Sequence, residues 1–132
     1  MFALAFAAAF VTDYLTKSVV VRRLAPGDEL GRAPVSLRHI SSAGLLNSRA
    51  VVLGCWLPMI VGSALLALTR FDTSLLAQAG LGLAAGGATG NALDRYLGRP
   101  IVDFMHVRGW RVFNAADAAI TCGVALALWG MV

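Results

Sequence analysis

The chain alternates between long apolar segments and shorter polar ones. Four apolar segments cover residues 2–21, 51–69, 75–93 and 113–132, and each is close to the ~20 residues that a helix needs to cross a bilayer. The connection at residues 70–73 is so short that the second and third segments must be antiparallel neighbours. This pattern predicts four transmembrane helices, the second of them kinked but not broken at Pro58.

The segments between these helices carry weaker signals. Val35 to Ile40 alternates loosely and predicts a short strand that lies over the membrane face. Thr73 or Ser74 is positioned to cap the third helix, and we expect a polar loop from Tyr96 to Val112. Gly82, Gly86 and Gly90 recur at every fourth position, a spacing that lets two helix backbones approach closely.

The composition is that of a membrane protein. Hydrophobic residues make up 58% of the 132 residues and charged residues only 14%, so the chain has too little polar surface to cover itself in water. We therefore predict one domain, residues 1–132, with an all-α, multipass membrane fold. The net charge of +4 comes from arginines between apolar segments, which favours anionic lipid headgroups over nucleic acid as a partner. His39 and His106 have no ligand at zinc-site spacing, and we expect neither a metal nor a cofactor.

Polar residues gather between residues 86 and 117, where the third helix ends and the fourth begins. They are Asn91, Asp94, Arg95, Asp103, Asn114 and Asp117. Asp103 and Asp117 should lie at the same membrane face, where two carboxylates in hydrogen-bonding range share one proton. Such a pair can activate a water and protonate a substrate carbonyl, so the two aspartates suggest peptide hydrolysis.

Two structural alternatives compete with this interpretation. Asn114 stands where the fourth helix should start, so that Asn114 and Asp117 also fit an N-cap and an acidic residue at the helix N-terminus. Asp13 and Lys17 lie four residues apart on one helical face. The simplest interpretation of that pair is a structural ion pair near the membrane surface, with Lys17 reaching toward water.

Three motifs taken together are more specific than any one residue. They are G-x-x-G-N-x-x-D-R at 87–95, I-V-D-F at 101–104 and F-N-x-A-D at 113–117, and D-x-x-T-K at 13–17 accompanies them. This set resembles the lipoprotein signal peptidase (signal peptidase II) family. The resemblance implies a four-helix membrane aspartic peptidase with a small extracytoplasmic loop and β-cradle element. Members remove the signal peptide of bacterial prolipoproteins just before a lipid-modified cysteine.

The resemblance also assigns roles to residues of this chain. It implies that Asp103 and Asp117 are the catalytic dyad, supported by Asn91, Asp94, Arg95 and Asn114, with Asp13 and Lys17 as structural support. The implied partners are diacylglyceryl-modified prolipoproteins and membrane phospholipids. The implied location is the bacterial cytoplasmic membrane, with the active site near the extracytoplasmic face. We expect a monomer.

Two features of the chain depart from the family pattern. The first-loop motif N-x-G-A-A-F is replaced by the residues from Ser42 to Arg49, which motivates an alternative: a divergent, weakly active or inactive paralogue that binds lipopeptides or inhibitors. All arginines except Arg70 lie at or between the ends of helices on the implied outer face, which is opposite to the positive-inside rule. A small transporter that uses Asp13 for ion coupling is a third hypothesis.

Overall fold

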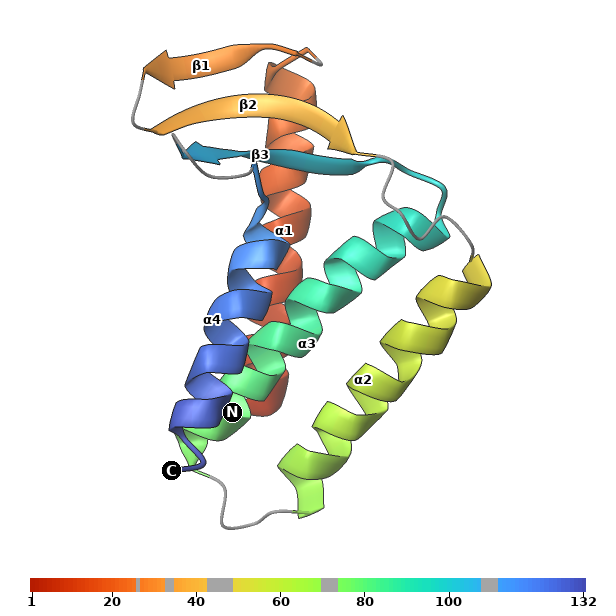
Figure 1. Ribbon diagram of the computed structural model, residues 1–132, viewed down its shortest axis with the longest axis vertical. Coiled ribbons are helices and arrows are strands. Elements are labelled where there is room, and N and C mark those ends of the chain that lie inside the picture. Colours follow the sequence, from red (N-terminus) through yellow and green to blue (C-terminus); the bar gives the residue numbers. More distant parts are fainter. Residues whose placement is uncertain (26, 33–34, 43–48, 70–73, 108–111) are drawn as a thin grey trace.

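The computed structural model describes residues 1–25, 27–32, 35–42, 49–69, 74–107 and 112–132. The helices are α1 (Phe2–Arg23), α2 (Arg49–Thr69), α3 (Leu75–Tyr96) and α4 (Ala115–Trp129), and the strands are β1 (Glu29–Arg32), β2 (Val35–Ser42) and β3 (Ile101–Val107). The four helices run side by side, and the sheet crosses one end of the bundle (Figure 1). Both termini lie at the opposite end.

The four predicted helices are present, with five boundaries that differ: α2 begins at Arg49 and α4 ends at Trp129. α1 continues to Arg23 and α3 to Tyr96, whereas α4 begins at Ala115, after its N-cap Asn114. The extension of α3 places Asn91, Asp94 and Arg95 on its last turns. Ser74 caps α3 as predicted, because its side chain accepts a hydrogen bond from the backbone N–H of Ala77.

The sheet accounts for the largest difference from the sequence prediction. The strand predicted from Val35 is confirmed as β2, which extends to Ser42 and pairs antiparallel with both β1 and β3. The loop expected from Tyr96 to Val112 is wrong, because residues 101–107 form β3. Gly98 adopts a φ of 68°, a conformation that suits glycine, and so turns the chain from α3 into this strand.

A register irregularity lies beside Asp103. Leu37 pairs with Met105 and Ile40 with Asp103, so β2 uses one residue more than β3 between these two pairs. A bulge of this kind bends its strand and changes the direction of neighbouring side chains. Val20 of α1 and Leu24, the C-cap residue after it, pack with Val102 and Phe104 of β3 in a buried cluster, which fixes the strand against the bundle.

α3 is the central helix and packs through glycines on two of its faces. Gly82 and Gly86 face α1, where a Cβ added at either position would lie 2.3 Å from a backbone oxygen, that of Phe2 or Phe6 respectively. Gly80 and Gly87 face α4 in the same way. The predicted packing role is therefore confirmed for Gly82 and Gly86, whose contacts bring the backbones together, whereas Gly90 faces the side chain of Asp13.

The outer faces of the helices are apolar. Leu4 is 72% exposed and Trp129 is 77% exposed, and large hydrophobic side chains are also exposed on α2 and α3. Among the described residues, α1 is the one helix both long and apolar enough to cross a membrane, while Trp56–Leu66 and Ala115–Trp129 are shorter apolar stretches.

The glycine packing predicts a large effect from a small substitution. We expect Gly86→Ala to lower the free energy of unfolding by about 1–3 kcal/mol, because its methyl group would overlap the α1 backbone. Gly62→Ala in α2 is the matched control, since nothing lies within 4 Å of its added Cβ, and it should be neutral or stabilising by roughly 0.5–1 kcal/mol. Thermal unfolding in detergent measures both variants. Equal melting temperatures would contradict the packing account.

Candidate active site

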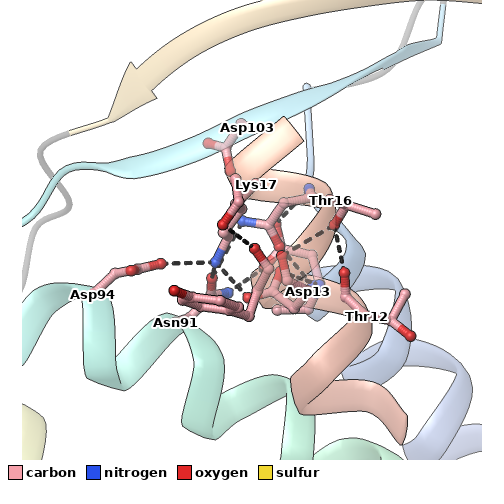
Figure 2. A network of polar contacts seen from close by, with 12 residues as sticks. Thr12, Asp13, Thr16, Lys17, Asn91, Asp94 and Asp103 are labelled. Atoms are coloured by element: carbon pink, nitrogen blue, oxygen red, sulfur yellow. Dashed lines mark hydrogen bonds and ion pairs between the residues drawn. The ribbon is translucent and has the colours of Figure 1, made fainter. Parts of the chain in front are cut away.

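Polar side chains from three helices and one strand meet beneath the sheet. Asp13 and Lys17 come from α1, Asn91 and Asp94 from the end of α3, and Asp103 from β3 (Figure 2). Asn114 and Asp117 complete the group at the start of α4. Seven of the eight residues predicted from the sequence are therefore joined in one hydrogen-bonded network.

Asn114 is the centre of this network and is fully buried, with 0% exposure. Its Oδ1 accepts a 2.9 Å hydrogen bond from the backbone N–H of Asp117. Its Nδ2 donates to Asp103 Oδ1 at 2.9 Å and to Asn91 Oδ1 at 3.2 Å. The Asn114 side-chain amide thus connects β3, which carries Asp103, to the first turn of α4, which carries Asp117.

Asp117 takes part in a capping box. The Asn114 side chain accepts from the Asp117 backbone, and Asp117 Oδ2 accepts from the Asn114 N–H at 3.4 Å. The capping interpretation of Asn114 and Asp117 is therefore confirmed. Asp117 Oδ1 also accepts a 2.9 Å hydrogen bond from Asn91 Nδ2. The Asp117 carboxylate thus caps α4 and also bonds to Asn91, which accepts from Asn114. A capping role for Asp117 is therefore compatible with a catalytic one.

Asn91 connects Lys17 to Asn114 and Asp117. Its Oδ1 accepts hydrogen bonds from Lys17 Nζ at 2.9 Å and from Asn114 Nδ2, while its Nδ2 donates to Asp117. With two donors received and one given, the side-chain amide has a fixed orientation. A carboxylate or a hydroxyl at this position cannot reproduce that set of bonds.

Lys17 is directed inward. Its Nζ lies 2.7 Å from Asp13 Oδ2 and 2.9 Å from Asp94 Oδ2, and it also donates to Asn91. The predicted ion pair with Asp13 is confirmed, but the expectation that Lys17 reaches toward water is wrong, because the side chain is buried. Two carboxylates and an amide replace the water that the ammonium gives up.

Asp13 is held by a backbone N–H group, a partner that no sequence motif can predict. Its Oδ1 accepts a 2.9 Å hydrogen bond from the backbone N–H of Ala116, in the first turn of α4. A Cβ at Gly90 would lie 2.5 Å from Asp13 Oδ2, so this glycine makes room for the carboxylate. Asp13 therefore ties α1 to the N-terminus of α4, where a negative charge is favourable.

Arg95 is the exception among the predicted site residues. Its Nε is buried and has no hydrogen-bond partner within the described part of the chain. Residues 43–48, which contain most of the altered first-loop motif, lie outside the described residues. A cluster on the sheet was not predicted: Ser36 Oγ donates to Glu29 Oε1 and lies 3.2 Å from His106 Nδ1. Its members are distant in sequence and match no motif.

The charges of the site are divided between two halves. The ammonium of Lys17 is bound to Asp13 and Asp94, whereas Asp103 and Asp117 receive neutral amide donors from Asn114 and Asn91. Among the described residues, no three His, Cys, Asp or Glu side chains are grouped as a metal ion requires.

Comparisons with known proteins identify the family of the chain. The lipoprotein signal peptidase of Rhodococcus jostii is 35% identical, over 87% of this chain and 64% of that protein. That of Gloeobacter violaceus is 36% identical, over 98% of this chain and 80% of its own length. A solved bacterial membrane enzyme has the same fold, with a TM-score of 0.86 at 22% identity over 98% of this chain and 86% of its own. A family model described as signal peptidase (SPase) II matches residues 5–132, and the chain therefore belongs to the signal peptidase II family.

Proposed function

We propose that this protein is an aspartic endopeptidase that removes the signal peptide from lipid-modified prolipoproteins, with Asp103 and Asp117 as its catalytic dyad. The observation that carries the proposal is the hydrogen bonding of Asn114, which holds the Asp103 carboxylate and the backbone of Asp117 at once. The names of the relatives support the substrate class. The whole matched region acts as one peptidase domain.

In the proposed reaction, water is the nucleophile and no covalent enzyme intermediate forms. One aspartate of the dyad, ionised, takes a proton from the water as its oxygen attacks the scissile carbonyl carbon. The other, protonated, donates to the carbonyl oxygen. As the tetrahedral intermediate collapses, the first aspartate gives its proton to the departing amine and the second takes back the proton from the hydroxyl group. Asn91 and Asn114 keep the two carboxylates in position while these protons move.

The enzyme acts within the cytoplasmic membrane, with its four helices spanning the bilayer and the sheet over the extracytoplasmic face. The exposed apolar side chains along the helices support this placement. The site lies beneath the sheet, at one end of the helices (Figure 1). The signal helix and the diacylglyceryl group of the substrate are apolar, so the substrate reaches this level from within the bilayer.

The dyad assignment predicts a selective loss of activity. Asp103→Asn and Asp117→Asn retain an oxygen that accepts from Asn114 and Asn91, so both variants should fold. Neither amide can exchange a proton with water as a carboxyl group does, and each variant should cleave about 10²–10⁴ times more slowly. The measurement is release of the signal peptide from a diacylglyceryl-modified prolipoprotein by the purified protein in nanodiscs.

Asp28→Asn serves as the matched control for these variants. Asp28 is exposed, and its carboxylate accepts from the backbone N–H of Ala25, away from the network. The control should retain wild-type cleavage. Activity that survives in either dyad variant would contradict the mechanism. A folded but silent wild type beside an active relative would contradict the function and favour the lipopeptide-binding alternative.

The membrane placement predicts which end of the bundle faces outward. Leu30 on β1 is 55% exposed, and Val132 lies at the opposite end. In intact cells, a membrane-impermeant maleimide should label Leu30→Cys and not Val132→Cys, with the unsubstituted protein as background for its own cysteines. Labelling of Val132→Cys alone would place the active site at the cytoplasmic face and contradict the proposed orientation.

A further inference from the structure

A cavity of about 400 Å³ lies beside the polar network, between the last turns of α1, the end of α3 and the start of β3. It is lined by Lys17, Ser18, Val21, Arg22, Asp94, Arg99, Pro100 and Val102. Lys17 and Asp94 form its boundary with the network, while the other six residues take no part in the proposed chemistry.

The charges that line the cavity are not balanced. The ammonium of Lys17 has three N–H groups, and Asp13, Asp94 and Asn91 accept from it. Arg22 and Arg99 differ, because no carboxylate of the described residues lies within salt-bridge distance of either guanidinium. Among the described residues, Lys17 is therefore the paired cation of this cavity, whereas Arg22 and Arg99 have no carboxylate partner.

The favourable interaction of a positive charge with the C-terminal end of α1 accounts for Arg22 but not for Arg99. Arg22 and Arg23 both lie in the last turn of α1, where positive charge is favourable. Of these two, only Arg22 lines the cavity, together with Arg99, which follows the turn at Gly98 and belongs to no helix. Two arginines from distant parts of the chain thus line one cavity.

The chemistry of the lining indicates the class of ligand. Guanidinium groups match the geometry of phosphate oxygens, and Val21, Pro100 and Val102 add an apolar wall. We propose that this cavity binds the phosphate ester of a membrane glycerophospholipid, with Arg22 and Arg99 on the phosphate and the apolar wall on the glycerol and the first acyl carbons. The diacylglyceryl group of the substrate carries no phosphate, so this lipid is a separate ligand.

The site adjoins the elements that hold the dyad. Val102 directly precedes Asp103 in β3, and the cavity shares Lys17 and Asp94 with the network. A bound lipid would therefore pack against the strand that carries Asp103. The inference rests on the proposed membrane placement and not on the peptidase reaction.

Lipid retention tests the site without any measurement of cleavage. Wild type, Arg22→Gln, Arg99→Gln and Arg23→Gln are transferred from phosphatidylglycerol nanodiscs into the gas phase, and the bound lipid is counted by native mass spectrometry. Loss of one charge-assisted contact should lower the affinity about tenfold in Arg22→Gln and in Arg99→Gln. Arg23→Gln removes the neighbouring charge from the same helical turn and should retain lipid as wild type does.

Two further samples identify the source of the phosphate. Diacylglycerol in the nanodisc has the same chains without the phosphate, and any that is retained should be retained equally by wild type, Arg22→Gln and Arg99→Gln. Millimolar glycerol 3-phosphate should leave the bound phospholipid in place, and displacement would assign the site to a soluble phosphate ester and overturn the lipid. Equal phospholipid retention by all four proteins, or diacylglycerol retention that falls in Arg22→Gln and Arg99→Gln, would also overturn the proposal. Because no turnover is measured, these outcomes are independent of whether the dyad assignment holds.

Discussion

A single buried amide determines the geometry of the site. Asn114 accepts from the Asp117 backbone and donates to Asp103 and Asn91, so its position decides where both aspartates lie. The same side chain starts α4, and local helix stability and the alignment of the dyad therefore depend on one group. Burying an amide without its hydrogen bonds costs free energy. This cost favours the arrangement in which Asn114 bonds to Asp103, Asn91 and the Asp117 backbone.

The amide is held there by close packing between helices. Glycines of α3 bring its backbone against α1 on one side and α4 on the other. That proximity lets Asp13 of α1 reach the Ala116 N–H of α4 and lets Lys17 reach Asp94 of α3. The glycine contacts thus set the spacing of the helices, and the charged residues fix the helix ends relative to one another.

Much of this was predictable from the sequence, and what was missed has physical reasons. Apolar runs near bilayer length identified the four helices, and the motifs identified the residues that meet. β3 was missed because its pairing with β2 joins residues that are 59 to 72 positions apart in the chain. The inward direction of Lys17 depends on Asn91 and Asp94, 74 and 77 residues away, and no local pattern reports such partners. The arginines that conflict with the positive-inside rule include the two that line the proposed lipid site.

The most direct test of the central claim separates the two roles of Asn114. In Asn114→Ser, the serine still caps α4 but has no amide to donate to Asp103 and Asn91. We expect unfolding stability to fall by only about 1–3 kcal/mol, while cleavage by the folded protein falls by about a hundredfold because Asp103 loses its alignment. A cleavage rate that falls only in proportion to the folded fraction would contradict the account.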